Sequence, residues 1–228
     1  MIRHVAIAAL VLWWPALALG QDTGPSFRPK RLTVSAGGVF AAAYPVGDIT
    51  ANLRRNTPGT PTPFPLLRAE SAIGRTAGAD LRVGVALTRA FEIEAGASYA
   101  APELGVTISQ DDELGEGAFA SERIEQYAVN VSGVYLIPRL RVGSRLRPYA
   151  IAGGGYLRQL HEGRLRVETG GTIHVGGGLR YWARGGGPRQ RALGARGEVR
   201  YVRRSGGIEF EERARGFPSV SVLGFVGF

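Results

Sequence analysis

Hydrophobic and polar residues alternate along most of this chain with a period of two, which is the pattern of a β-strand with one apolar face. Residues 217–228 show the alternation most clearly. One face carries Val220, Val222, Gly224, Val226 and Phe228, and the other carries Ser219, Ser221, Leu223, Phe225 and Gly227. A charge-free apolar strand left as an open edge would recruit other chains through its unpaired amides. We therefore expect residues 217–228 to be paired on both sides, as in a closed barrel.

Seven further stretches alternate in the same way: 32–44, 75–87, 91–104, 121–137, 148–159, 168–183 and 191–203. Each is long enough to cross an apolar band of ~25 Å at a tilt of ~40°, which takes about ten residues. In most of them one face is apolar and the other is polar or charged. The pattern predicts an all-β, eight-stranded antiparallel up-and-down transmembrane β-barrel, closed where 217–228 pairs with 191–203 and 32–44.

In the fifth stretch, 148–159, we expect Tyr149, Ile151 and Leu157 to face outward, and Tyr156 and Arg158 to face inward.

The connections between these stretches alternate in length. The longer, polar ones are 45–74, 105–120, 160–167 and 204–216, and the shorter ones are 88–90, 138–147 and 184–190. Residues 45–74 are rich in proline, so they are predicted to form a loop. With both termini in the periplasm, the longer connections would lie outside the cell.

Outward aromatic residues near the strand ends predict girdles at the two membrane interfaces. They are Tyr44, Phe91, Tyr99, Tyr127, Tyr135, Tyr149, Tyr181, Tyr201 and Phe228.

Charged residues on the inward faces predict the contents of the lumen. They are Asp80, Arg82, Glu92, Glu94, Arg158, Arg180, Arg196, Glu198 and Arg200. An eight-stranded barrel is just wide enough for side chains to fill it. Because buried charges must be paired and both signs are present, we expect a packed salt-bridge network. A narrow ion path is the alternative.

The first 20 residues have the organisation of a secretory signal peptide, with basic Arg3, an apolar run and small residues before Gln21. The apolar run is shorter than the ~20 residues of a spanning helix, and no later segment has ~18 uninterrupted apolar residues. Residues 21–31 are predicted to be a polar tether and residues 32–228 the barrel domain.

Several other classes of function find no support in the sequence. The chain has no cysteine, which excludes disulfides, thiolate metal sites and a lipoprotein anchor. The glycine runs 153–155 and 176–178 lack the Lys-Ser/Thr of a phosphate-binding loop.

The net charge is +9, but without a basic helix or an aromatic platform we expect no nucleic-acid partner. No metal and no cofactor are predicted, although the acidic residues 111–113 leave a weak divalent-cation site open.

The arginines of the predicted turn at 138–147 are expected to meet anionic lipid headgroups.

Two histidines follow the predicted signal peptide, His161 and His174, and neither has a serine close by in the sequence. We therefore expect no catalytic site, although a partner distant in sequence stays open.

The chain resembles the small eight-stranded outer-membrane β-barrel family, of the outer-membrane protein A transmembrane-domain and outer-membrane protein X type. The similarity lies in residues 148–156 (PYAIAGGGY), residues 193–201 (LGARGEVRY) and the alternation that ends at Phe228. It implies an integral outer-membrane protein of a Gram-negative bacterium, in contact with outer-membrane lipids including lipopolysaccharide. It also implies that Val222, Gly224, Val226 and Phe228 form the signal for the barrel assembly machinery.

These patterns together predict a non-enzymatic, monomeric barrel with a structural or adhesion-like role. The largest connection, 45–74, is the expected contact for an extracellular ligand. The alternatives are a small-solute pore and a lipid A-modifying outer-membrane enzyme. A soluble lipocalin-like barrel would carry its apolar residues inside, and the charges opposite a continuous apolar face argue against it.

Overall fold

The computed structural model describes residues 30–53, 64–109, 118–138, 140, 145–161, 166–184, 190–208 and 215–228. The predicted signal peptide 1–20, most of the tether 21–31 and the acidic residues 111–113 lie outside these ranges. Among the described residues, no helix is long and apolar enough to cross a membrane.

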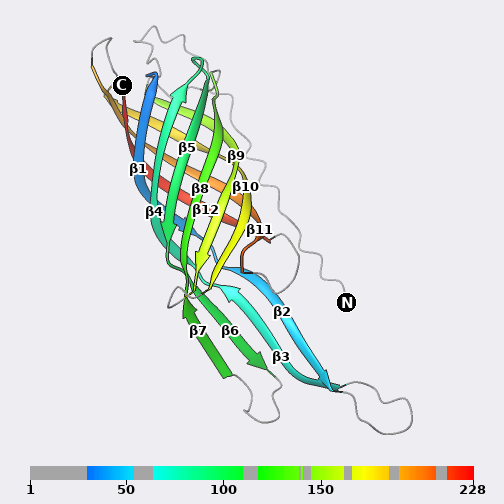
Figure 1. Ribbon diagram of the computed structural model, residues 1–228. Coiled ribbons are helices and arrows are strands. Elements are labelled where there is room, and N and C mark those ends of the chain that lie inside the picture. Colours follow the sequence, from blue (N-terminus) through cyan, green and yellow to red (C-terminus); the bar gives the residue numbers. More distant parts are fainter. Residues whose placement is uncertain are drawn as a thin grey trace.

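Eight strands form a closed antiparallel barrel (Figure 1), which confirms the predicted fold class. They are β1 (Leu32–Ala41), β4 (Thr76–Ala86), β5 (Phe91–Ala100), β8 (Glu125–Leu136), β9 (Leu146–Leu160), β10 (Val167–Arg184), β11 (Ala192–Gly206) and β12 (Arg215–Gly227). Strand β12 pairs with both β11 and β1, as the sequence predicted. At the seam the Phe228 amide donates to the Leu32 carbonyl at 2.8 Å.

The predictions of loops at 45–74 and 105–120 are wrong, because both regions contain strands. Strands β2 (Tyr44–Leu53), β3 (Phe64–Ile73), β6 (Glu103–Ser109) and β7 (Ala118–Arg123) form a second, four-stranded sheet in that order. This sheet, here called the extension, leaves the barrel at the lower end in Figure 1. Pro45 suggested a break, but it lies in edge strand β2, where a missing amide costs little.

The barrel therefore has two different ends. The extension continues from one of them, called the extension end. The other, called the terminus end, carries the β1–β12 closure at Phe228 and the short turn between β4 and β5.

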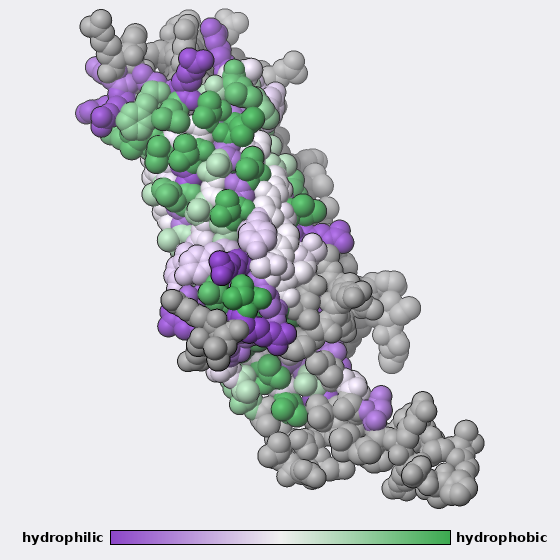
Figure 2. Space-filling model, in the orientation of Figure 1, coloured by the Kyte–Doolittle hydropathy of each residue, from purple (hydrophilic) through white to green (hydrophobic). Residues whose placement is uncertain are grey.

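The outer wall of the barrel is apolar and the inner wall is polar. Val129, Val131 and Val222 are 58%, 57% and 65% exposed, whereas Arg82 and Glu92, which point inward, are each 1% exposed. Figure 2 shows hydrophobic side chains over the barrel wall, with hydrophilic ones gathered at its upper end and at its lower end, where the extension begins. The strands thus place apolar side chains outside and charges inside.

Exposed aromatic side chains lie near both ends of the barrel. Those toward the terminus end are Phe91, Tyr135, Tyr181 and Phe228, and those toward the extension end are Phe40, Tyr99, Tyr127, Tyr156 and Tyr201. Tyr44 and Tyr149 were predicted to belong to the girdles, but both are buried, at 4% and 2% exposure.

Strand β9 has the opposite orientation to the one predicted. Tyr149, Ile151 and Leu157 point into the lumen and are buried, whereas Tyr156 and Arg158 are exposed. The inward placement of Arg158 was therefore wrong. The physical reason is the apolar packing at the terminus end of the lumen, which takes up Tyr149 and Ile151 and leaves the small Ala150 and Ala152 outside.

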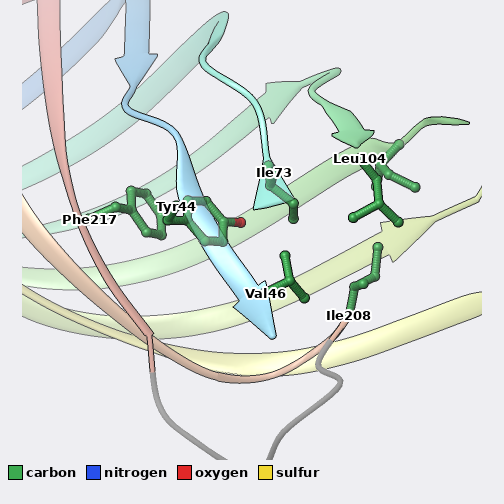
Figure 3. Packing of buried hydrophobic residues seen from close by; sticks show 7 residues of the cluster. Tyr44, Val46, Ile73, Leu104, Ile208 and Phe217 are labelled. Atoms are coloured by element: carbon green, nitrogen blue, oxygen red, sulfur yellow. The ribbon is translucent and has the colours of Figure 1, made fainter. Parts of the chain in front are cut away.

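Two apolar clusters close the lumen around its polar interior. The terminus-side cluster contains Val134, Leu136, Tyr149, Ile151, Trp182, Ala192 and Phe225. The extension-side cluster contains Tyr44, Val46, Ile73, Leu104, Ile124, Ile208 and Phe217 (Figure 3). In the second cluster Tyr44 stacks on Phe217 with ring centroids 4.3 Å apart. Residues from the extension thus help to cover the end of the barrel.

Candidate functional site

The candidate site is the lumen between these two clusters. Eight of the nine charged residues predicted to point inward are buried there: Asp80, Arg82, Glu92, Glu94, Arg180, Arg196, Glu198 and Arg200. They come from four strands, β4, β5, β10 and β11, whose period-two alternation turns every second side chain toward the barrel axis. Arg158 is the exception described above.

Glu198 is the centre of the charge network. Its Oε1 atom lies 2.7 Å from Arg82 Nη1 and also contacts Arg200 Nε, and its Oε2 atom lies 2.9 Å from Arg196 Nη2. Tyr149 Oη donates a further hydrogen bond of 2.7 Å to Oε2. The Glu198 carboxylate therefore forms ion pairs with three guanidinium groups and accepts a hydrogen bond from a phenol.

The remaining carboxylates extend the network on either side. Arg82 Nε donates to Asp80 at 3.1 Å. Glu94 accepts from Arg196 Nη2 at 2.9 Å, and Glu92 accepts from Arg180 Nη1 at 2.7 Å. Such pairs gain little net stability over apolar packing, but removing one partner leaves an uncompensated buried charge. The charges of the network therefore depend on one another: each must keep its partner, although the pairs add little to the free energy of folding.

Glycine makes room for these long side chains. A Cβ atom on Gly178 would lie 2.7 Å from Tyr149 Oη, the hydroxyl that donates to Glu198. The network therefore needs glycine at this position, because a side chain would clash with the Gly197 carbonyl oxygen and with Tyr149.

Arg204 belongs to the lumen although the sequence analysis placed it in a connection. Its Nη1 atom donates to Tyr44 Oη at 2.7 Å and its Nη2 atom to the Ile208 carbonyl at 2.5 Å. Arg204 continues the inward period of Arg196, Glu198 and Arg200 along β11, and this is the signal that could have identified it.

Two glycines in left-handed conformation bring Ile208 back over the barrel end. Gly206 and Gly207 have φ angles of 74° and 86°, a region that favours glycine. The Ile208 amide then donates to Gln159 Oε1 at 3.1 Å. Burial in this cluster raises the pKa of Tyr44, and the neighbouring Arg204 opposes that rise.

The structure brings one histidine and one serine together that are far apart in sequence. Ser132 Oγ lies 2.9 Å from His174 Nε2, inside the lumen, and Arg200 Nη1 lies 3.4 Å from the same nitrogen. His161 lies elsewhere, at the extension end, 3.0 Å from Glu122.

The surroundings of the Ser132–His174 pair do not favour nucleophilic catalysis. A serine nucleophile needs a base whose other nitrogen is oriented by a third group. In the described part of the chain, His174 has only Ser132 and Arg200 as hydrogen-bond partners. The Arg200 guanidinium opposes the positive charge that the ring would gain. Both side chains face the lumen and are buried.

A cavity of about 100 Å³ lies next to this pair. Its charged or titratable lining residues are Asp80, Arg82, His174, Arg200 and Arg204. Neutral polar groups such as Asn130 and Ser219, and apolar side chains such as Leu157 and Phe217, form the rest of the lining. Within the described ranges, no cluster of three or more His, Asp or Glu residues is arranged to hold a metal ion.

No protein-family model matches the sequence, and no curated protein is similar to it. Among solved structures, the chain is similar to the outer membrane protein OprG from Pseudomonas aeruginosa, with a TM-score of 0.50 and 10% identity over 88% of this chain and 96% of OprG. The outer membrane protease OmpT from Escherichia coli matches with a TM-score of 0.34 and 11% identity, over 90% of this chain and 99% of OmpT. The OmpT similarity is too low to support an argument. The OprG similarity shows the fold alone, and at that level it agrees with the resemblance found in the sequence: the chain folds as an eight-stranded outer-membrane-type β-barrel.

Proposed function

We propose that the protein is a non-enzymatic, integral outer-membrane barrel with a structural or surface-interaction role carried by the extension. The observation that carries this proposal is the division of the barrel wall, with apolar side chains outside and a paired charge network inside. A barrel with this division is stable in lipid, because closure satisfies every backbone amide of the wall.

The outer wall supports a location in the bilayer. Large apolar side chains are exposed on all eight strands of the barrel. An ordinary soluble monomer rarely exposes an apolar patch of more than a few hundred Å². With the terminus end in the periplasm, the extension lies outside the cell. The exposed aromatic residues at both ends then meet the two interfaces, and arginines near the terminus end meet anionic headgroups.

The filled lumen supports a structural role over an open pore. Side chains of the charge network cross the barrel from β4 and β5 to β10 and β11, and an apolar cluster lies on each side of the network. The small-solute pore remains a second candidate because the lumen also contains the cavity of about 100 Å³.

The extension supports a surface interaction. It is an open sheet with two edges, β2 and β7, and Phe119 on β7 is 68% exposed. Open edges and exposed aromatic side chains are common features of surfaces that bind other molecules. The extracellular ligand expected at residues 45–74 would therefore meet the β2–β3 hairpin.

Three measurements test this proposal. The protein should be extracted from outer membranes by detergent and should migrate differently on a gel before and after heating; a freely soluble mature protein would refute it. Planar bilayers containing the protein should show no steady conductance, whereas regular conductance steps would favour the pore.

The third measurement concerns the hairpin. Gly47 and Ser71 are directly paired, so residues 48–70 can be replaced by Asn-Gly, the residues of a two-residue hairpin turn. The variant should remain heat-modifiable, since Tyr44, Val46 and Ile73 are kept, but cells displaying it should lose binding to surface ligands. Unchanged binding would refute the role of this hairpin.

A further inference from the structure

The buried charges of the lumen do not balance. Among the described residues, five arginines are buried there, Arg82, Arg180, Arg196, Arg200 and Arg204, against the four carboxylates Asp80, Glu92, Glu94 and Glu198. Since a buried charge is costly unless it is paired, one excess positive charge in this position requires a partner.

The ion pairs show where the excess lies. Arg180 has Glu92, Arg196 has Glu94, and Arg82 has Asp80. Arg200 has only Glu198, which it shares with two other arginines. Arg204 contacts a tyrosine hydroxyl and a carbonyl. Within the described chain, buried nitrogen atoms without a hydrogen-bond acceptor occur on Arg180 and Arg196 as well as on Arg200 and Arg204. Because Arg180 and Arg196 each have a carboxylate, the excess charge is assigned to Arg200 and Arg204, toward the extension end of the lumen.

The cavity of about 100 Å³ lies at the same level and is lined by both of these arginines. Arg200 and His174 keep 6% and 7% exposure, whereas Arg82 and Arg204 keep 1% each. Arg200 is thus the cation that an occupant of the cavity can reach, with His174 beside it. Asn130 on β8 and Ser219 on β12 add neutral polar groups from opposite sides of the barrel.

We infer that this cavity binds one small monovalent carboxylate, held by Arg200. Arg200 Nε contacts Glu198 and Nη1 lies near His174, so Nη2 is the atom that can donate a charge-assisted hydrogen bond to the ligand carboxylate. A cavity of ~150 Å³ accommodates benzene, so the present one has room for about four non-hydrogen atoms, the size of acetate. The site adds a ligand to the lumen and does not depend on what the extension binds.

The test uses the full mature chain refolded in detergent, with acetate as the probe. The thermal midpoint of heat-modifiable migration is followed while sodium acetate replaces sodium gluconate at constant ionic strength, because gluconate is too large for the cavity. The midpoint should rise and saturate with acetate. Acetamide, which has the same shape but no charge, should have no effect.

Two variants locate the site. Arg200→Gln should weaken the acetate response about tenfold or more, the loss expected for a charge-assisted hydrogen bond, whereas Arg203→Gln, on the exposed face of the same strand, should not. Ala128→Leu keeps every charge but fills the cavity that Ala128 lines, and it should also abolish the response. An unchanged response in either Arg200→Gln or Ala128→Leu, no saturation in the unmodified protein, or an equal response to acetamide would overturn the inference.

Discussion

At the scale of single residues, the lumen depends on Glu198. Its side chain is completely buried and contacts Arg82, Arg196 and Arg200. An ion pair at the surface of the extension, Arg68–Glu70, has side chains that are 50% and 59% exposed. The same chemistry therefore occurs in two very different environments within one chain.

We expect Glu198→Gln to lower the free energy of unfolding by about 3–5 kcal/mol, because it leaves three buried guanidinium groups with one carboxylate fewer. Glu70→Gln, the matched control, should cost less than about 1 kcal/mol. Urea unfolding of both variants in the same detergent measures the difference. Equal losses would show that the network is solvated.

Gly178 provides a second prediction at this scale. Gly178→Ala should lower stability by about 1–3 kcal/mol, the usual cost of overpacking, because the new methyl group meets both the Gly197 carbonyl oxygen and Tyr149 Oη. Gly197→Ala is the control, since a Cβ atom there has nothing within 4 Å. A thermal midpoint that falls equally in both variants would contradict the proposed crowding.

The alternation located eight buried charges from the sequence, but it misplaced Arg158 and missed Arg204. In β9 both faces carry apolar residues and the middle of the strand is three glycines, so the sequence pattern hardly distinguishes the two faces. The packing of Tyr149 and Ile151 in the terminus-side cluster decides which face of β9 points into the lumen. In β11 the inward period continues through Arg204, but Arg203 and Arg204 together resemble the start of a charged loop. Ser132 and His174 meet only because β8 and β10 both flank β9, which no local spacing encodes.

At the scale of strands, the sequence predicted the eight barrel strands but not the four of the extension. Strand β2 contains Pro45 at a register shift, and β3 contains Pro65 at another. Both irregularities suit an open sheet outside the barrel and also remove the period-two signal. The predicted stretches 32–44, 91–104 and 121–137 joined barrel and extension strands that the structure separates at short breaks.

The terminal strand supports a prediction about assembly. Phe228 joins β12 to Leu32 through backbone hydrogen bonds, and its ring lies 5.1 Å below the Arg191 guanidinium. Deleting Phe228 should strongly reduce the heat-modifiable fraction in outer membranes, because the barrel loses both a closing contact and an exposed interface aromatic. Phe119→Ala, which removes an exposed aromatic from the extension, should leave that fraction unchanged. A normal fraction without Phe228 would contradict its role as an assembly signal.

At the scale of the whole molecule, closure distinguishes the two sheets. The barrel has no edge, whereas the extension has two. Amide hydrogens of an open edge exchange through small local openings, while those of a closed ladder need larger ones.

Hydrogen exchange should therefore be fast in β2 and β7 and slow in the barrel strands, including β1 and β12 at the seam. The β9–β10 pair, which lies away from the seam, is the internal control for β12, since both belong to the closed barrel. Exchange at the seam as fast as in β7 would show that the barrel opens there.

The length of the extension determines how far it reaches from the membrane. Strand β2 has ten residues, so at a rise of ~3.3 Å per residue it is roughly 30 Å long. It starts at Tyr44, which packs in the cluster at the barrel end, and runs away from the barrel. A bilayer's polar headgroup layer is only about 5–8 Å thick on each side. In the proposed orientation, the far end of β2 at Leu53 would stand clear of that layer, within reach of a neighbouring cell or a large soluble molecule that cannot approach the bilayer itself.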